Sequence, residues 1–311
     1  MKEVNYYTIT GSKVLVTGGN GFFGKHVCKE LSANGCQVLS PTSDEMNLLN
    51  LDSTFSYYEK NRPDFVIHLA GYNGGIKFNT DFPADIFIQN TTMAINLHVC
   101  ARTLKTVKIL SVLASCAWEQ PKNEFITPED ILTGKPDQTV SCHGYAKRNL
   151  YLLSDFCRQE YGLNSNTVCV TTLYGPGDTY DPLRTKVMGA MVKRFVDAAE
   201  SGVNDVVCWG TGTPKRQFVY VEDAAKMMIN SLKHQPTKYP LFIGSPDNIS
   251  IKNLAEMVAK EAGFAGIILW DHSKPDGQNS KRMLTTHRLN PDSEYTPLIE
   301  GIRKTIEDYK K

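Results

Sequence analysis

Short apolar runs alternate with longer amphipathic stretches through the first half of the chain. The run at 14–17 is apolar and β-branched, which is typical of a buried parallel strand. Further strands are predicted at 37–40, 64–71, 107–114 and 165–173. Helical periodicity covers 25–33, 51–61, 86–103 and 137–162. Strands that alternate with helices predict the α/β class, here a doubly wound parallel sheet with helices on both of its faces.

A turn rich in glycine follows the first predicted strand. Because glycine has no Cβ, such a turn brings bare backbone N–H groups and a helix N-terminus up to a pyrophosphate. A glycine triplet alone is weak evidence, but this one lies between a strand and a helix, as a dinucleotide site requires. The candidate residues are Gly18, Asn20, Gly21, Phe22, Phe23 and Gly24 in the turn, with Leu69, Ala70 and Gly71 at the end of the strand 64–71.

The end of the second strand is where such folds contact the adenosine ribose. An acidic residue there bonds the 2′-hydroxyl of NAD, whereas basic residues accommodate the 2′-phosphate of NADP. The turn offers the hydroxyls of Thr42 and Ser43 and no Arg or Lys, and Asp44 lies a few residues past the expected position. The sequence therefore leaves both NADP and NAD open.

The pattern beyond residue 176 is less regular. Helices are predicted at 187–201, from 222 onward, at 250–262 and at 298–309, and short strands at 206–209, 218–221, 241–244 and 267–270. We therefore expect some elements of the later half to join the sheet of the first half. We expect a dinucleotide-binding domain over 1–174, with returns near 215–245, and a smaller substrate-binding domain over 175–214 and 246–311.

The composition is that of an ordinary globular protein. Of 311 residues, 41% are hydrophobic and 22% are charged, and the net charge is +1. We therefore expect no nucleic-acid partner, and no membrane association, since no apolar run reaches spanning length. The eight cysteines contain no C-x-x-C pair, which predicts neither a metal site nor a disulfide framework and fits the cytoplasm.

Several motifs point to one family. They are Gly74-Gly75-Ile76, Pro83-Ala84-Asp85, Ser115-Cys116, Tyr174-Gly175-Pro176, the segment 209–218 and the segment 274–277. Together with the G-x-x-G-x-x-G turn, they make the chain similar, almost end to end, to the GDP-L-fucose synthase family of extended short-chain dehydrogenase/reductases. The resemblance implies a Rossmann fold and an epimerase/reductase that acts on a GDP-linked 4-keto hexose with NADPH.

The resemblance also implies two sets of reactive groups. For reduction, a Ser or Thr and a Tyr-x-x-x-Lys pair surround the substrate C4 oxygen, and the tyrosine supplies the proton. For epimerisation, a cysteine and a histidine act on opposite faces of the sugar. Lys147 keeps the position of the lysine, which the resemblance also implies to hold the nicotinamide ribose of the cofactor, and Cys116 matches the cysteine.

Three partners depart from that pattern. The tyrosine position is His143, and the hydroxyl position is Ala114, with Ser115 adjacent to it. Gly177, after Tyr-Gly-Pro, stands where the resemblance places the histidine.

Two residues are candidates for the missing phenol. His143 shares a helix face with Lys147, and its reference pKa of about 6.5 lies near working pH. The lysine would lower that pKa and favour a neutral imidazole, which still donates one N–H. Alternatively, His143 only fills the space that the phenol left. Tyr145, two positions from Lys147, would reach the site only if the helix start shifted in register.

Substrate contacts follow from the resemblance as well. Arg216 matches an arginine near the nucleotide diphosphate, a group that a guanidinium binds with two hydrogen bonds. Lys186 occupies a position where the family often has histidine. Lys193 and Arg194 either add to this region or form a solvated helix face. The remaining candidates are Trp209 and Lys274.

The altered positions lead us to expect variant chemistry, at one carbon, rather than the full fucose-forming sequence. The alternative is a catalytically silent relative that binds a GDP-sugar or related nucleotide sugar and has a regulatory or scaffolding role. The resemblance further implies a homodimer through the helices 86–103 and 145–160.

Overall fold

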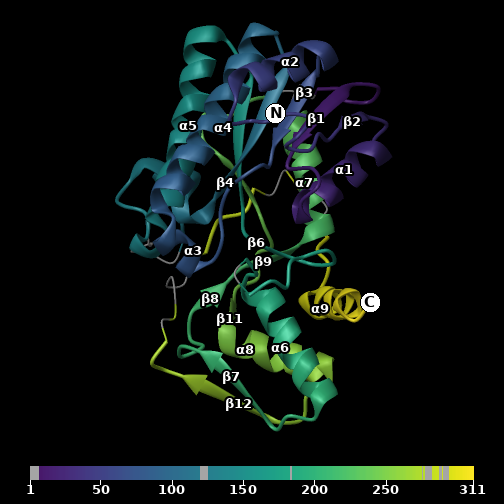
Figure 1. The fold of residues 1–311 in the computed structure, drawn as a ribbon, viewed down its shortest axis with the longest axis vertical. Coiled ribbons are helices and arrows are strands. Elements are labelled where there is room, and N and C mark those ends of the chain that lie inside the picture. The colour runs from purple at the N-terminus through teal and green to yellow at the C-terminus, as the bar shows by residue number, and fades with distance from the viewer. Residues whose placement is uncertain are drawn as a thin grey trace.

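A six-stranded parallel sheet forms the core of the upper part of the structure in Figure 1. The computed structural model describes residues 7–119, 125–182, 184–274, 276, 282–286, 289 and 294–311. The strands of the sheet are β1 (Lys13–Thr17), β2 (Gln37–Leu39), β3 (Phe65–His68), β4 (Lys108–Ala114), β5 (Ser165–Val170) and β10 (Leu241–Ile243). Their order is β10-β5-β4-β3-β1-β2, so β1 lies between β2 and β3. In this doubly wound topology, ligands bind outside the carboxyl ends of the strands where the order reverses.

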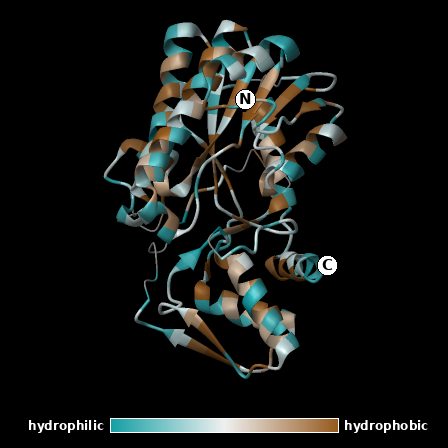
Figure 2. Ribbon diagram, viewed as in Figure 1, coloured by the Kyte–Doolittle hydropathy of each residue, from teal (hydrophilic) through white to brown (hydrophobic). Residues whose placement is uncertain are grey.

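Helices cover both faces of the sheet. On one face, α1 (Phe22–Ala33) packs against α7 (Val221–Lys233). On the other face lie α2 (Leu51–Asn61), α4 (Pro83–Thr103) and α5 (Ser141–Tyr161). Figure 2 shows hydrophobic residues concentrated on the strands and hydrophilic residues on the outer turns of the helices.

Alternate residues of a strand serve the two faces. Val14 and Val16 of β1 belong to the hydrophobic cluster with α1 and α7, and Leu15 between them belongs to the cluster with α2 and α4. All three side chains are fully buried. Because helices cover both faces, the strands are continuous apolar runs, and this is why the sequence pattern located them.

One charged side chain is fully buried beside the sheet. Lys108, at the start of β4, donates from Nζ to the main-chain oxygens of Ser231 (2.8 Å), Leu232 (2.9 Å) and His234 at the end of α7. A helix end leaves such carbonyls without intrahelical partners, and its dipole favours a cation there. Burial lowers the pKa of Lys108 to about 7. The contact fixes α7 against the sheet.

A second group of elements lies below the sheet in Figure 1. Its helices α6 (Val187–Ser201), α8 (Ile251–Ala262) and α9 (Leu298–Tyr309) share one hydrophobic cluster, in which Val192 and Phe195 are fully buried. Three strand pairs accompany them: β6 (Thr172–Tyr174) with β9 (Phe218–Tyr220), β7 (Asp205–Trp209) with β12 (Ile267–Asp271), and β8 (Lys215–Arg216) with β11 (Ile249–Ser250). The short helix α3 (Ile76–Asp81) precedes α4.

The structure confirms the predicted α/β class with its parallel, Rossmann-like sheet. The run 165–173 forms two strands rather than one, because the Thr171 amide bonds to Ile243 in the central sheet while the Thr172 amide bonds to Gln217 outside it. The helix predicted from 137 begins at Ser141, because Asp137 caps a separate 3₁₀ turn, η3 (Gln138–Val140). Within the described ranges, none of the helices has both the length and the apolar character needed to cross a membrane.

Candidate active site

The glycine turn between β1 and α1 is closed by backbone contacts. Gly18 has φ +70°, and a Cβ there would lie 2.8 Å from the Ala70 nitrogen. A Cβ on Gly24 would lie 2.1 Å from the Gly18 oxygen. Backbone atoms cannot move aside, so only glycine fits at these two positions. Gly21 is the N-cap of α1, and having no side chain it leaves the first amides of the helix to an anion.

A pocket of about 440 Å³ opens beside this turn. It is lined by Thr17, Gly18, Asn20, Pro41, Thr42, Ser43, Met46, Asn47, Leu48, Leu49, Ala70 and Met93. The volume lies in the range of small-molecule and cofactor sites. The predicted Thr42, Ser43 and Ala70 therefore lie together, whereas Leu48 and Met93 were missed. Single apolar residues in a loop and in a helix carry no spacing signal that would reveal them.

Buried and partly buried hydrogen bonds fix the end of β3 next to the turn. The Thr17 hydroxyl oxygen lies 2.8 Å from Nδ1 of His68 and accepts from the Ala70 amide at 3.3 Å. Asn90 of α4 bonds to both the amide and the carbonyl of Tyr72. Burial, followed by the charge of Lys147, holds the pKa of His68 well below its ordinary value. The segment 69–71 is thereby held against the glycine turn, where the sequence predicted a cofactor border.

His143 and Lys147 lie one turn apart on α5, and both are buried, with exposed fractions of 6% and 8%. The Lys147 Nζ donates to the Val112 oxygen of β4 at 2.8 Å, and burial lowers the pKa of Lys147 to about 8. Burial, followed by the charges of Lys147 and Lys186, lowers the pKa of His143 to about 3. Nδ1 of His143 is buried and makes no hydrogen bond. The pair therefore presents a neutral imidazole with an unbonded ring nitrogen.

Cys116 lies beside the start of α5. It belongs to the 3₁₀ turn η1 (Ser115–Ala117) after β4, and 8% of it is exposed. A Cβ on Gly144 would lie 2.6 Å from the Cys116 oxygen, so this glycine permits the close approach of α5 to η1. Cys116 also acts on the pKa of Lys147, which it raises against the larger effect of burial. The structure thus brings Cys116, His143 and Lys147 together, with Ser115 partly buried next to them.

Arg148 supports the loop beside this site, and the sequence did not predict this role. Its guanidinium donates to the main-chain oxygens of Ala117 (2.5 Å), Thr133 (2.9 Å) and Gly134 (2.8 Å). The side chain is 7% exposed. An arginine directly after Lys147 on a helix was the only signal, and a buried arginine looks no different from a solvated one in the sequence. Arg148 therefore ties α5 to both ends of the loop that follows β4.

Tyr145 lies on a different face of α5 from His143 and Lys147. It is 41% exposed, and its ring centroid is 5.8 Å from the guanidinium carbon of Arg148. The two residues that share the buried face are therefore those four apart, as helix geometry requires.

Lys186 and Gly177 lie in different surroundings. Lys186 is the N-cap of α6, and its charge lowers the pKa of His143. The Gly177 amide instead donates to Oδ2 of Asp308 on α9 at 2.7 Å, in an exposed position. The second group of elements therefore contributes the charge of Lys186 to the surroundings of His143.

Arg216 of β8 is partly buried between acidic groups. Burial lowers its pKa, while Asp137 and Asp276 raise it. Asp276 accepts from the amide and the hydroxyl of Thr211, at 2.6 and 2.8 Å, and so is tied to the turn after Trp209; Pro275 and Gly277 of the same motif lie outside the described residues. The Nζ of Lys274 lies 5.8 Å from the centroid of the Trp209 ring, which is 61% exposed. These two motifs thus meet beside Arg216.

Lys193 and Arg194 have partners inside the second group of elements. The Lys193 Nζ donates to Asp197 (2.9 Å) and to the Tyr309 hydroxyl (3.0 Å), which links α6 to α9. Arg194 donates to the Val207 oxygen of β7 at 2.6 Å. Both side chains thus hold this part of the fold together.

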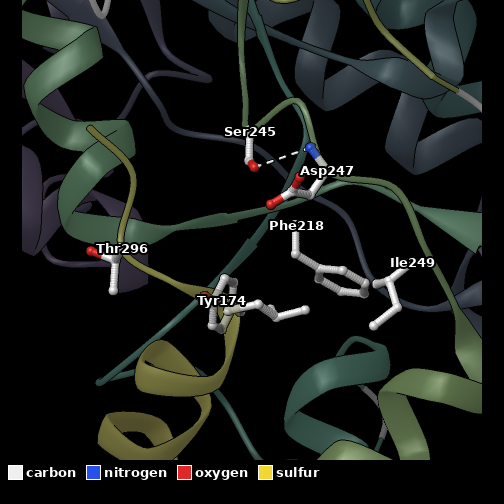
Figure 3. A pocket seen from close by; sticks show the side chains of 7 residues that line it. Tyr174, Phe218, Ser245, Asp247, Ile249 and Thr296 are labelled. Carbon is white, nitrogen blue, oxygen red and sulfur yellow. Dashed lines mark hydrogen bonds between the residues drawn. The ribbon is translucent and has the colours of Figure 1, made fainter. Parts of the chain in front are cut away.

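Figure 3 shows the side chains that line a separate small cavity, Tyr174 among them. Its lining includes Phe218, Asp247 and Thr296, and the Asp247 amide donates to the Ser245 hydroxyl at 3.2 Å. The cavity measures about 20 Å³, which is room for about one water molecule. It is therefore too small to hold a sugar nucleotide.

The residues at the carboxyl edge of the sheet fit a dinucleotide. The glycine turn is too tight to admit a Cβ at Gly18 or Gly24, Gly21 leaves the first amides of α1 without a side-chain cap, and the adjoining pocket has the volume of a cofactor site. No group of His, Cys, Asp and Glu in the part of the chain that the structure describes is arranged to hold a metal ion.

Comparison with known proteins gives concordant matches. A model described as the NAD dependent epimerase/dehydratase family matches residues 14–244. The chain is 33% identical over 310 residues to a GDP-L-fucose synthase of Dictyostelium discoideum, and the match covers 96% of each protein. It is 30% identical to a GDP-L-colitose synthase of Yersinia pseudotuberculosis, over 95% of this chain and 97% of that protein.

Among solved structures, a GDP-L-fucose synthetase from Naegleria fowleri bound to NADP matches with a TM-score of 0.89 and 28% identity. The match covers 98% of this chain and 96% of that one. The similarity therefore extends over both the sheet and the second group of elements.

Proposed function

The chain belongs to the NAD dependent epimerase/dehydratase family, and on that premise we propose that it is a nucleotide-sugar epimerase/reductase. Its substrate is a GDP-linked 4-keto hexose and its cofactor is NADP or NAD. The relatives named as GDP-L-fucose and GDP-L-colitose synthases, and the Naegleria fowleri structure bound to NADP, support this assignment. The observation that carries it is the buried His143–Lys147 pair beside Cys116, with an unbonded imidazole nitrogen.

The roles of the pair follow from their pKa values. The dinucleotide, when bound, supplies the hydride that reduces the ketone. His143, with a pKa near 3, is neutral at pH 7, so its ring N–H polarises the C4 oxygen by a hydrogen bond. Lys147, with a pKa near 8, is mostly protonated at pH 7. Its ammonium stabilises the developing alkoxide and is the source of the proton that the oxygen takes up.

Cys116 is the proposed acid/base for proton exchange at a carbon next to the ketone. Its electrostatic interaction with Lys147 places a positive charge near the sulfur, and the thiolate is the reactive form of a cysteine. Lys186 is the candidate for the group that returns the proton, because its charge acts on the same site. With the family histidine replaced, we propose variant chemistry that stops at a single epimerisation or a single reduction.

Arg216, Trp209 and Lys274 are the proposed contacts for the nucleotide diphosphate and its base. They lie around one pair of motifs, and the guanidinium of Arg216 suits phosphate oxygens. We also propose the division into a dinucleotide-binding domain, 1–174 with returns near 215–245, and a substrate-binding domain, 175–214 and 246–311. All eight cysteines are thiols rather than disulfides, which supports a cytoplasmic location.

The first test follows NADPH or NADH oxidation with GDP-4-keto-6-deoxymannose. We expect wild-type turnover, a fall in kcat of about 10²- to 10⁴-fold in His143→Ala with little change in KM, and activity in His143→Tyr. Tyr145→Phe separates the two candidate donors, because it retains the wild-type rate only if His143 is the one in use. Normal fucose production would contradict the variant chemistry.

A silent relative is the second candidate, and the loss of the phenol favours it. At neutral pH the imidazole at 143 has no charged form to give up a proton, since its pKa lies near 3. This function predicts that the dinucleotide and GDP-sugar bind while no nucleotide sugar changes the cofactor absorbance. Activity gained only in His143→Tyr would support it over the enzyme.

We propose a homodimer through α4 and α5. These neighbouring helices expose Ile88 (58%), Ile95 (44%) and Phe156 (56%), large apolar side chains that a partner would cover. Light scattering should give twice the chain mass of 34.7 kDa, and Phe156→Glu should reduce it to one chain. Val203→Glu is the control, because Val203 is equally exposed but lies after α6. A monomeric wild type would refute the dimer.

A further inference from the structure

The loop after β2 carries acidic and no basic groups where it borders the dinucleotide pocket. Pro41, Thr42 and Ser43 line the pocket together with Asn20 of the glycine turn. None of the described lining residues is Lys, Arg or His, and the sequence has none from residue 37 to residue 59. Asp44 and Glu45 follow directly. In this fold the end of β2 is the place that meets the adenosine ribose.

Glu45 already binds the donors that this loop offers. Its Oε2 accepts from the Thr42 amide at 2.8 Å and from the Thr42 hydroxyl at 3.1 Å. The Met46 amide donates to the Thr42 oxygen at 3.0 Å and closes the turn. These hydrogen bonds lower the pKa of Glu45, so its carboxylate is charged at neutral pH. A 2′-phosphate would meet a carboxylate on the amide and hydroxyl that would otherwise bind it.

A ribose with a free 2′-hydroxyl meets no such conflict. The hydroxyl oxygens of Thr42 and Ser43 retain lone pairs that accept from it, and no charge is brought near Glu45. The loop is also tied to the glycine turn, because the Asn20 amide group donates to the Ser40 oxygen at 3.4 Å. The ribose end of the site is therefore held in a fixed relation to the turn that binds the pyrophosphate.

We propose that Glu45, through Thr42, makes this protein bind NAD(H) more tightly than NADP(H), although both dinucleotides fit the glycine turn. The inference rests on the proposed function, since it presupposes that the pocket holds a nicotinamide dinucleotide. It identifies Glu45 as a residue that sets cofactor specificity without contacting the reacting atoms. Because Glu45 is exposed, the preference decreases as salt screens its charge.

Equilibrium binding to the full chain tests this without turnover. Dissociation constants for NADH and NADPH are measured from nicotinamide fluorescence, at low and at high salt. For the wild type we expect NADH to bind at least tenfold tighter than NADPH, with a smaller ratio at high salt. Glu45→Gln should tighten NADPH at least threefold and leave NADH unchanged. Ser43→Arg, which adds a guanidinium at the lining, should tighten NADPH at least tenfold.

Glu256→Gln is the matched control, because Glu256 is an exposed glutamate on α8, and its NADH to NADPH ratio should equal that of the wild type. Equal or tighter binding of NADPH by the wild type would overturn the inference and leave the proposed function standing. An unchanged ratio in Glu45→Gln would overturn the role of Glu45 in the same way. Failure to bind either dinucleotide would overturn the proposed function and the inference with it.

Discussion

The glycine turn after β1 and the start of α5 lie at the same edge of one sheet but are constrained differently. At the turn, main-chain atoms lie where a Cβ of Gly18 or Gly24 would be, so the backbone itself prescribes the residue. At the start of α5, position 143 meets no such limit and holds an imidazole where the resemblance implied a phenol. A backbone constraint fixes the cofactor end, whereas the reaction end is free to change its chemistry.

Arg148 explains why the reaction end tolerates such a change. Its three hydrogen bonds go to main-chain oxygens on both ends of the loop after β4, and none goes to a reactive side chain. Arg148 thus holds η1 and the start of α5 by contacts that do not involve the side chain of residue 143. The difference between the two ends leads to three predictions, in order of decreasing effect.

The largest effect is expected from Gly24→Ala. The new Cβ would lie 2.1 Å from the Gly18 oxygen and 2.5 Å from the Gly19 Cα, so the turn must open. We expect at least a hundredfold loss of dinucleotide affinity and a loss of stability of about 1–3 kcal/mol, measured by nicotinamide fluorescence and thermal unfolding. Gly202→Ala is the control: Gly202 has φ +69° with nothing within 4 Å, so only backbone strain is added and affinity is kept. Wild-type affinity in Gly24→Ala would contradict the backbone constraint.

Arg148→Gln should impair the reaction end, at the start of α5, and leave the cofactor end, at the glycine turn, nearly unchanged. The three carbonyls lose a charged donor in a buried site, which is expected to destabilise the fold by about 3 kcal/mol. Because η1 and the start of α5 then lose their tie, kcat should fall at least tenfold while the dinucleotide affinity changes less than threefold. Arg102→Gln, on the surface of α4, is the control. A parallel loss of affinity and of kcat would show that the ends are coupled.

The sequence predicted the features that local backbone constraints determine, and it missed those that depend on partners far along the chain. The strand at 14–17, the glycine turn and the helix after it were predictable, because a covered parallel strand is continuously apolar and a tight turn requires glycine. The break between β5 and β6 was not, since Thr171 and Thr172 differ only in their partners at Ile243 and Gln217. Ile243 and Gln217 lie far along the chain, and no local sequence pattern indicates them as partners.

The candidate site shows more clearly which contacts cannot be predicted from the sequence. His143 and Lys147 were predictable as neighbours from their spacing on a helix. That Lys186 acts on His143, while Gly177 bonds to Asp308, depends on how the second group of elements packs against the sheet. Arg148 was unpredictable for a related reason: its burial results from a loop folding over it.

The smallest effect concerns the pH dependence of stability. The pKa of His143 is about 3 in the folded protein, below the ordinary value of about 6.5, so as pH falls the unfolded chain takes up the proton first. The stability that comes from the neutral imidazole is therefore complete above pH 6.5 and is lost progressively as the pH approaches 3. Its contribution to the slope is at most about 1.4 kcal/mol per pH unit.

His143→Phe should remove that contribution. Chemical unfolding between pH 7.5 and 4.5 should show a shallower loss of stability in the variant, and the two curves should separate as the pH falls. His68 and His98, whose pKa values burial also lowers, remain in both proteins, so the difference between the curves isolates position 143. Tyr145→Phe, on the same helix and without an imidazole, should keep the wild-type slope. Parallel curves for His143→Phe and the wild type would mean that the imidazole is solvated, and the neutral hydrogen-bond donor at the reaction end would lose its basis.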